Sequence, residues 1–208
     1  MIGEIIAVGT ELTTGRTLNT NAQYLADKLA ELGIECHYQT AVGDNGLHLR
    51  KALSAATARS QIIILTGGLG PTKDDLTKEV VCSAVGEELV LHEESLRRME
   101  AYFKRTGREM TENNLKQVML PKDAVVFPND YGTAPVFALV AAKQCIILLP
   151  GPPREMHPMF ETYVRQFLTR FADGVIVSHE VNIFGMGESA VAKLLEDFPE
   201  SGNPYTAL

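Results

Sequence analysis

The sequence has few cysteines, no long apolar run and no excess of basic residues, and each shortage excludes a class of protein. Its three cysteines, Cys36, Cys82 and Cys145, lack the close pairs of zinc sites or small disulfide frameworks. Such sparse thiols are typical of a reducing compartment, so we expect a cytoplasmic protein. No stretch approaches the roughly 20 apolar residues that span a membrane. The short run Ile2–Val8 contains Glu4 and has no basic leader, which indicates a strand and not a signal peptide.

Acidic side chains outnumber basic ones. The 26 Asp and Glu residues against 19 Lys and Arg residues give a formal net charge of −7. A surface with this balance repels nucleic acids and anionic lipids at long range, so we expect neither direct nucleic-acid binding nor membrane association. With 208 residues, 45% of them hydrophobic, the chain can bury a core without disulfides or structural metals.

Short apolar runs alternate with longer amphipathic segments along the chain. Two of the runs, residues 62–65 and 146–149, are apolar on both faces, which is typical of strands covered by helices on each side. The alternation predicts an α/β fold with three layers, α/β/α, around a mostly parallel sheet. Strands are expected at Glu4–Val8, Glu35–Val42, Gln61–Thr66, Ala124–Phe127, Val136–Ala141 and Cys145–Leu149.

Helices are expected between these strands. Their approximate ranges are 22–32, 49–60, 74–85, 93–106, 111–119 and 153–171. Asn21 is the candidate N-cap of the first helix. We therefore expect one main domain over residues 1–172. Residues 173–208, with a strand over Val175–Phe184 and a helix over Glu188–Phe198, are expected to form a small appended α+β segment, the start of a further subdomain.

The most informative segment is a buried strand that ends in a glycine-rich turn and leads directly into a helix. The turn reads Thr66-Gly67-Gly68-Leu69-Gly70-Pro71-Thr72-Lys73-Asp74-Asp75. Glycines let backbone N–H groups face a ligand, and a helix N-terminus adds further N–H groups and partial positive charge. The pattern predicts a phosphate cradle of neither the Walker nor the dinucleotide-fingerprint type. A turn with no ligand is the alternative, because such turns are common in α/β proteins.

Two adjacent acids at the end of this turn indicate a cation. One of them is explained as an ordinary helix cap, since Thr72 and Asp75 have the spacing of a capping box. Both Asp74 and Asp75, however, would repel each other and a bound phosphate. A divalent ion such as Mg²⁺ that bridges carboxylate and phosphate oxygens resolves this conflict.

Two further acids follow other predicted strands. Glu11 comes after the first strand, and Asp44 comes after the second. Ligands of open α/β sheets bind outside the carboxyl ends of the strands, so we expect Glu11, Asp44 and Asp75 to converge. Each acid alone has another explanation: Asp44 as the cap of the next helix, and Glu11 as part of a solvated loop.

A fourth strand end offers a rigid turn with a basic residue. The turn is Pro150-Gly151-Pro152-Pro153-Arg154. Gly151 allows close backbone approach, and Arg154 offers planar donors to a phosphate. A loop of small residues, 132–135, precedes another strand. The sequence has no His-Glu-x-x-His or Gly-x-Ser-x-Gly pattern, so zinc-hydrolase and α/β-hydrolase interpretations are unsupported.

Taken in order, these motifs resemble the N-terminal domain of the competence/damage-inducible protein CinA family, which is related to the molybdopterin-binding fold of the MogA and MoaB proteins. The resemblance covers nearly the whole chain, and its matching segments are 9–12, 19–22, 42–45, 66–77, 107–114, 132–135 and 149–153. It implies a metal-dependent pyrophosphatase that converts ADP-ribose-like molecules to AMP and a sugar phosphate. It also implies that Asp44 and Asp75 lie in the substrate site. The chain departs from the family at Thr13-Thr14, where two apolar residues are usual.

The predicted mechanism combines the cradle and the acids. Backbone N–H groups of residues 67–70 hold the diphosphate, and the predicted catalytic and metal-binding residues Glu11, Asp44 and Asp75 position one or two divalent ions (Mg²⁺, Mn²⁺ or Co²⁺). A water activated by such an ion attacks one phosphorus in line, while Arg154 or Lys73 offsets the growing charge. The predicted binding residues are Thr10, Thr66, Gly67, Gly68, Gly70, Pro71, Lys73, Asp74, Gly151 and Arg154.

The expected partner is a small-molecule nucleotide, and we expect the protein to form a homo-oligomer. Two other functions stay open. One is the binding or transfer of a molybdopterin or adenylate group. The other is a non-catalytic module linked to competence or DNA damage, which would keep its function after Asp44→Ala and Asp75→Ala.

Overall fold

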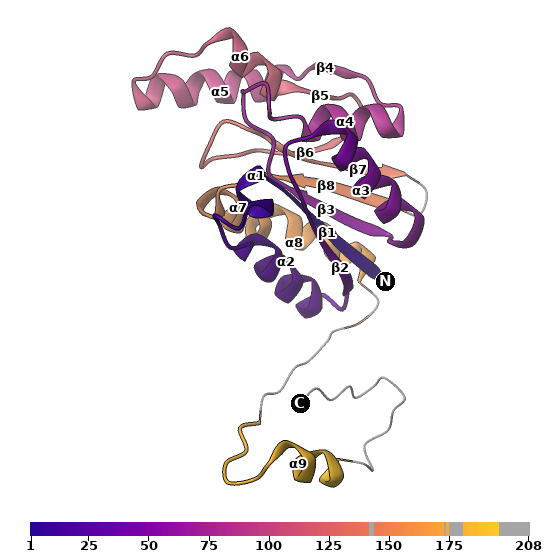
Figure 1. The fold of residues 1–208 in the computed structure, drawn as a ribbon. Coiled ribbons are helices and arrows are strands. Elements are labelled where there is room, and N and C mark those ends of the chain that lie inside the picture. The colour runs from indigo at the N-terminus through magenta and orange to yellow at the C-terminus, as the bar shows by residue number, and fades with distance from the viewer. Residues whose placement is uncertain (142–143, 173, 175–180, 196–208) are drawn as a thin grey trace. The chain divides into compact units, whose positions relative to one another are not determined.

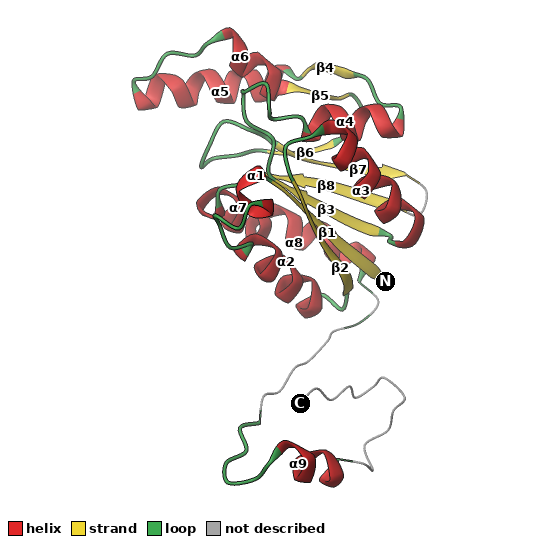
Figure 2. Ribbon diagram, viewed as in Figure 1, coloured by secondary structure: helices red, strands yellow, loops and turns green. Residues whose placement is uncertain are grey.

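The computed structural model describes residues 1–141, 144–172, 174 and 181–195. The chain divides into two compact units, Met1–Ile176 and Val177–Leu208. In the first unit, helices cover both faces of a six-stranded sheet (Figures 1 and 2). In the second unit, α9 spans Glu188–Leu194, and residues 181–184 have no regular secondary structure. Leu195 caps the end of α9, and the other residues of the predicted strand and helix, 175–180 and 196–198, lie outside the described residues.

The sheet has the order β2-β1-β3-β8-β7-β6. The bounds of its strands are β1 Ile2–Val8, β2 Glu35–Val42, β3 Ile62–Thr66, β6 Val125–Phe127, β7 Val136–Ala141 and β8 Gln144–Leu149. The four strands from β2 to β8 run parallel, whereas β7 and β6 are antiparallel to their neighbours. The predicted mostly parallel sheet is confirmed, and each of the six strands predicted for the main domain agrees with the observed one to within two residues.

Every residue of β3 is buried, because a separate hydrophobic core lies on each face of the sheet. Ile62 and Ile64 pack among the side chains of α2, α7 and α8. Ile63 and Leu65 pack on the opposite face among those of α3 and α4. The helices are α2 Thr20–Glu31, α3 Gly46–Arg59, α4 Thr77–Val85, α7 Pro153–Met159 and α8 Arg165–Leu168, with a π-helical turn over Phe160–Val164 and a 3₁₀ turn over Thr169–Phe171. None of the described helices is both long and apolar enough to cross a bilayer.

Several helices begin at other residues than predicted. Asn19, not Asn21, caps α2, because its side chain accepts a hydrogen bond from the Ala22 N–H. Asn45 caps α3, so Asp44 is free of the capping role considered for it. Helix α4 begins three residues later than Asp74, because the chain first completes a turn over residues 71–76. An unpredicted one-turn helix, α1, spans Thr10–Thr13.

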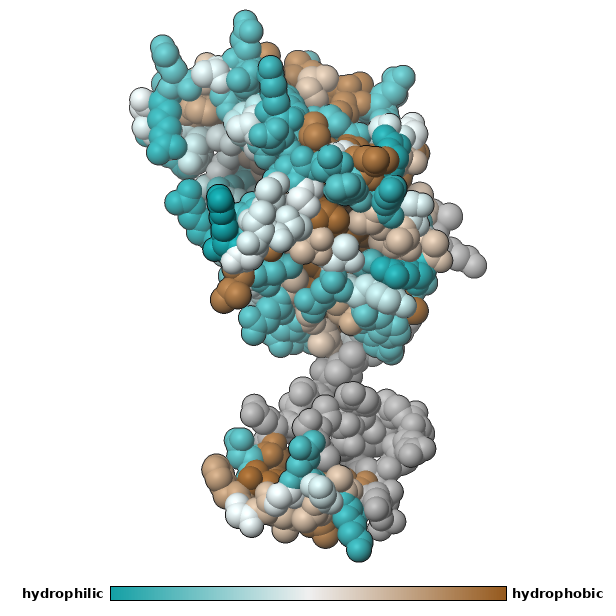
Figure 3. Space-filling view, in the orientation of Figure 1, coloured by the Kyte–Doolittle hydropathy of each residue, from teal (hydrophilic) through white to brown (hydrophobic). Residues whose placement is uncertain are grey.

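Residues 89–121, which we call the arm, form a smaller layer beside α4 (Figure 1). In the arm, β4 Leu89–Leu91 pairs antiparallel with β5 Met119–Pro121. Between these strands lie α5 Glu93–Thr106, α6 Glu112–Leu115 and a 3₁₀ helix Lys116–Val118. The single helix predicted over 111–119 is therefore two short ones. Only Ser95 and Met99 of α5 are buried, and its outer face is largely hydrophilic in Figure 3.

Candidate functional site

A cavity of about 460 Å³ lies at the carboxyl ends of β1, β3 and β8. It is lined by Val8, Gly9, Glu11, Asp44, Gly67, Gly68, Leu69, Gly70, Pro71, Thr72, Asp74, Asp75, Gln117, Thr133, Ala134, Pro150, Gly151, Pro152 and Glu155. The cavity thus brings together all three predicted catalytic acids and most of the predicted binding residues. Thr10, Thr66, Lys73 and Arg154 are not part of its lining.

The first two glycines of the turn have backbones that other residues adopt only with strain. Gly67 has φ +100°, and a Cβ there would lie 2.2 Å from the Val8 carbonyl oxygen. Gly68 has φ +67°, and its Cβ would lie 2.2 Å from Thr77 Oγ1. That hydroxyl instead donates a hydrogen bond to the Gly67 carbonyl at 2.8 Å. The turn is therefore pressed against both β1 and the start of α4 in a way that only glycine permits.

The turn leaves three consecutive N–H groups available. The Gly67 N–H donates to the Leu149 carbonyl at 3.1 Å, which joins the turn to the end of β8. The N–H groups of Gly68, Leu69 and Gly70 have no acceptor among the described residues, and all three residues line the cavity. Successive N–H groups of this kind form a concave site for an anion.

Asp44 and Asp75 are held in the same way, each by a threonine. Asp44 Oδ2 accepts hydrogen bonds from the N–H and hydroxyl of Thr10, at 2.8 and 2.7 Å. Asp75 Oδ2 accepts from the N–H and hydroxyl of Thr72, at 2.9 and 2.6 Å. In both carboxylates, Oδ1 has no hydrogen-bond partner among the described residues. Each acid is thus fixed by one oxygen and has the other for a ligand.

Glu11 reaches the cavity from α1. Its carboxylate folds back over Gly9, where a Cβ would lie 2.3 Å from Glu11 Oε1. Glu11 also lines an adjoining cavity of about 100 Å³. Within the part of the chain that the structure describes, no three His, Cys, Asp or Glu side chains are close enough to hold an ion by themselves. The predicted convergence therefore holds for the cavity wall and not for a complete set of metal ligands.

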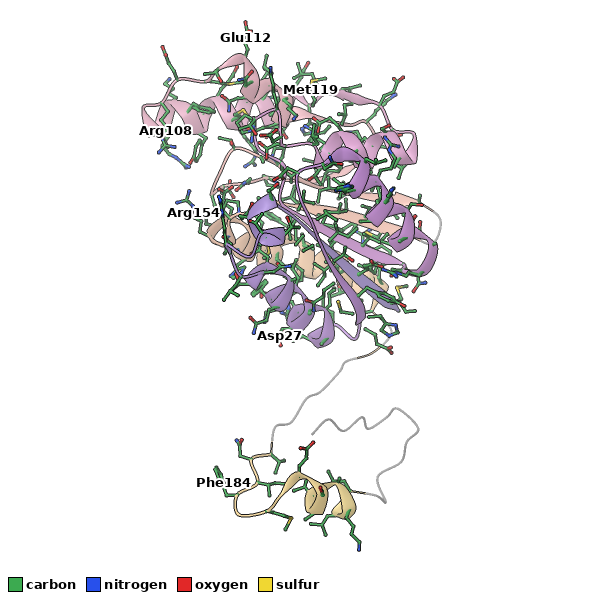
Figure 4. All side chains as sticks on the ribbon, in the orientation of Figure 1. Asp27, Arg108, Glu112, Met119, Arg154 and Phe184 are labelled. Atoms are coloured by element: carbon green, nitrogen blue, oxygen red, sulfur yellow. The ribbon has the colours of Figure 1, made fainter. Side chains whose placement is uncertain are left out.

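All charged side chains among the described lining residues are acidic. They are the five carboxylates Glu11, Asp44, Asp74, Asp75 and Glu155, and none of the described lining residues is Lys, Arg or His. Neither of the two basic residues predicted to act on the phosphates, Lys73 and Arg154, lines the cavity. Lys73 is exposed in the turn, and Arg154 points away from the body of the domain (Figure 4). Successive residues of a helix face different directions, so at the start of α7 the cavity receives Glu155 in place of Arg154.

Among the lining residues outside the predicted set, Glu155 and Gln117 make hydrogen bonds that shape the cavity. Glu155 Oε2 accepts a hydrogen bond from Asn129 Nδ2 at 3.0 Å and lies on the backbone of Gly132, where a Cβ would be 1.9 Å away. Gln117 comes from the arm. The small-residue loop 132–135 was a sequence signal for the position of Glu155. Gln117 Nε2 donates to the Leu69 carbonyl at 3.2 Å, and the sequence contains no signal for this contact.

Thr10 and Thr66 support the site without lining the main cavity. Thr66 Oγ1 donates to the Pro150 carbonyl at 2.8 Å and accepts from Asn21 Nδ2 at 3.0 Å. The Asn21 amide also donates to the Gly151 carbonyl at 2.7 Å, so it ties α2 to the turn after β8. The unusual Thr13-Thr14 pair makes local bonds only, because both hydroxyls donate to the Thr10 carbonyl.

The fold and the cavity together define the class of the domain. The family described as "probable molybdopterin binding domain" matches residues 4–170. The molybdopterin biosynthesis enzyme MoaB from Thermus thermophilus is 18% identical with a TM-score of 0.52, over 85% of this chain and 99% of that one. The tungsten cofactor synthesizing protein MoaB from Pyrococcus furiosus is 16% identical with a TM-score of 0.51, over 83% and 97%. The chain has the molybdopterin-binding fold.

Within this class, the chain belongs to the CinA family. A CinA protein of unknown function from Thermoplasma acidophilum is 30% identical with a TM-score of 0.73, over 79% of this chain and 96% of that one. A putative competence-damage inducible protein of Clostridium novyi is 50% identical over 208 residues, and one of Bacillus cereus (strain ATCC 14579) is 52% identical over 198 residues, 95% of this chain. The chain spans about half the length of these two relatives, 50% and 48%. The predicted family is confirmed.

Proposed function

We propose that this domain is a divalent-metal-dependent hydrolase that splits the diphosphate of ADP-ribose or a similar nucleotide into AMP and a sugar phosphate. The observation that carries the proposal is the composition of the cavity wall. It combines free backbone N–H groups, which suit phosphate oxygens, with five carboxylates and no described basic side chain. A diphosphate can enter such a cavity only if a cation accompanies it.

The carboxylates suit Mg²⁺ or Mn²⁺, because these ions prefer oxygen ligands. In such a site, Asp44 and Asp75 would bind the ion through their free Oδ1 atoms. Mg²⁺ commonly binds through one or two carboxylates together with substrate phosphates and water, and a cavity without three clustered protein ligands fits this mode. We therefore expect the ion to bind tightly only together with the nucleotide.

The chain's own residues have distinct tasks in this proposal. The N–H groups of Gly68, Leu69 and Gly70 bind phosphate oxygens and keep the diphosphate in one orientation. Thr10 and Thr72 hold the carboxylates of Asp44 and Asp75 by one oxygen each, so that the other oxygen would be available to an ion. When bound, the ion supplies charge neutralisation and lowers the pKa of a coordinated water.

The direct test is incubation of the purified protein with ADP-ribose and Mg²⁺, Mn²⁺ or Co²⁺, with the products identified by mass spectrometry. We expect AMP and ribose phosphate in equal amounts, and none in the presence of a chelator. The absence of AMP with every metal would refute the hydrolase.

A second function is supported by the family match, whose description names molybdopterin binding. A pterin–adenylate conjugate also carries a diphosphate and could use the same N–H groups. Binding of molybdopterin without turnover of ADP-ribose would favour this second function. If neither ligand bound, and the double variant with Asp44→Ala and Asp75→Ala kept its biological role, the domain would be a non-catalytic module.

A further inference from the structure

Three side chains of the arm form a chain of hydrogen bonds that ends on the glycine turn. Asn114 Oδ1 accepts from the N–H and the hydroxyl of Thr111, at 2.9 and 3.0 Å. Asn114 Nδ2 donates to Gln117 Oε1 at 3.2 Å, and Gln117 Nε2 donates to the Leu69 carbonyl at 3.2 Å. Residues 111–117 thereby reach a part of the turn that lies more than 40 positions earlier in the sequence.

The donors and acceptors in this series of hydrogen bonds can be arranged in only one way. Asn114 and Gln117 are only 8% and 4% exposed, so their amide groups depend on protein partners for their hydrogen bonds. The Thr111 N–H can only donate, which places Asn114 Oδ1 on that side and Nδ2 toward Gln117. Gln117 must then present Oε1 to Asn114 and Nε2 to the turn. Reversal of the Gln117 amide would put its oxygen against the Leu69 carbonyl oxygen.

The direction matters for the cavity because a trans peptide points its carbonyl and its N–H in opposite directions. Gln117 holds the Leu69 carbonyl, so the N–H of the same peptide, that of Gly70, points away from Gln117 and has no described acceptor. Gly70 also lies against Asp75, since a Cβ there would be 2.5 Å from Asp75 Oδ2. The next part of the turn has its own support from Lys116, whose ammonium group donates to the carbonyls of Thr72, at 3.1 Å, and Asp75.

We propose that Gln117 is a positioning residue for the nucleotide site: through the Leu69 carbonyl it turns the Gly70 N–H toward a phosphate oxygen. The proposal rests on the function proposed above for its ligand, a nucleotide diphosphate. Asn114 acts through Gln117 and does not itself line the cavity. The arm, by this account, sets the conformation of a binding loop that belongs to the main sheet.

The test compares three variants with the wild type. Gln117→Met removes the donor to Leu69 without a change in charge. Asn114→Ala breaks the chain one step earlier, outside the cavity. Gln144→Met is the matched control, because Gln144 also donates from a partly buried amide to backbone carbonyls, those of Thr57 and Ser60, at the opposite end of β8.

Affinity for ADP-ribose with Mg²⁺ is measured by calorimetry, and amide signals of the ligand-free proteins by ¹⁵N NMR. We expect Gln117→Met and Asn114→Ala each to weaken binding by about tenfold or more. KM is expected to rise more than kcat falls, and the Gly70 amide signal is expected to shift before any ligand is added. Gln144→Met is expected to change none of these.

Two results would overturn the proposal. If Asn114→Ala binds like the wild type while Gln117→Met does not, Gln117 touches the ligand itself and does not position the turn. If the Gly70 signal is unchanged in both variants, the turn does not depend on the arm. The NMR comparison needs no ligand, so it decides the positioning role even if the wild type neither binds nor hydrolyses a nucleotide. If Gln117→Met fails to fold, Asn114→Ala alone decides.

Discussion

Asp75 uses its two carboxylate oxygens for different purposes. Oδ2 closes the turn by accepting two hydrogen bonds from Thr72, and Oδ1 has no described partner. An asparagine can keep the first role through its own oxygen while it loses the charge. Asp75→Asn should therefore lower hydrolysis by on the order of a hundredfold and change the free energy of unfolding by less than about 1 kcal/mol.

Product formation and urea unfolding measure the two effects. The matched control is Asp74→Asn, the same change one residue earlier, at an exposed side chain with no hydrogen bond to a described residue. We expect Asp74→Asn to lower hydrolysis much less than Asp75→Asn does. Equal losses in the two variants would mean that the net charge of the turn matters and the individual carboxylate does not.

Lys78 makes stability depend on pH. It is 5% exposed in α4, and burial lowers its pKa to about 8. In the unfolded chain a lysine titrates near 10.4, so between about pH 8 and pH 10.4 the unfolded chain holds a proton that the folded one lacks. The contribution of Lys78 to the free energy of unfolding therefore rises with pH across that window. Below pH 8 the full cost of burying the charged lysine is present.

The variant Lys78→Met should lose this pH dependence. From pH 7.5 to pH 10, the unfolding free energy of the wild type should rise relative to that of the variant, by up to about 3 kcal/mol. Urea unfolding at a series of pH values measures the difference. Parallel profiles for the two proteins would show that Lys78 keeps an ordinary pKa.

Strand β3 contributes side chains to both hydrophobic cores of the domain. Ile63 and Ile64 are both fully buried, but they belong to the cores on opposite faces of the sheet. Truncation of either to alanine should cost about 2–5 kcal/mol. Because one strand serves both cores, each variant should still unfold in a single transition.

Thermal unfolding followed by circular dichroism and by calorimetry measures this. Gln39→Ala on the exposed edge strand β2 is the control and should stay within about 0.5 kcal/mol of the wild type. Two separate transitions in Ile63→Ala would contradict the prediction, since they would show that the two cores melt independently.

The elements also show what the sequence could and could not predict. The six strands were predictable because β-branched runs such as Ile62–Leu65 have the length and the two-faced hydrophobicity of covered strands. The meeting of Asp44, Asp75 and Gly151 followed from the rule that parallel strands end at one edge. The strands β4 and β5, three residues each, are too short to show a period.

Two features of the cavity lining could not be read from the sequence, each for a physical reason. The sequence analysis gave Glu155 no role, and it lines the cavity while Arg154 does not, because residue type alone does not give the rotation of a helix relative to the cavity. Gln117 was missed because its contact with Leu69 depends on the arm folding back across 48 positions of sequence. Both are tertiary effects, which local patterns do not contain.

At the scale of the whole molecule, the cavity and its supports belong to one unit. Every lining residue precedes residue 156, and the unit Met1–Ile176 contains the whole six-stranded sheet. A chain shortened to residues 1–176 should therefore fold alone, with an unfolding midpoint within a few degrees of that of the full chain. Its affinity for ADP-ribose with Mg²⁺ should be unchanged.

Differential scanning calorimetry and isothermal titration test this expectation on the two chains side by side. A large loss of affinity in the shortened chain would assign part of the site to residues 177–208. The result would also apply to the two relatives, because the region that matches this chain makes up about half of each of them.

The contact between Glu155 and Gly132 makes the volume of the cavity adjustable from outside its lining. Gly132 is not a residue of that lining, yet a methyl group on it would meet the Glu155 carboxylate at 1.9 Å. Because this carboxylate is the end of a flexible side chain, we expect it to move while the backbone stays in place. A substitution at residue 132 should therefore change the volume of the cavity, and with it the size of the ligand that fits, without any change to a lining residue.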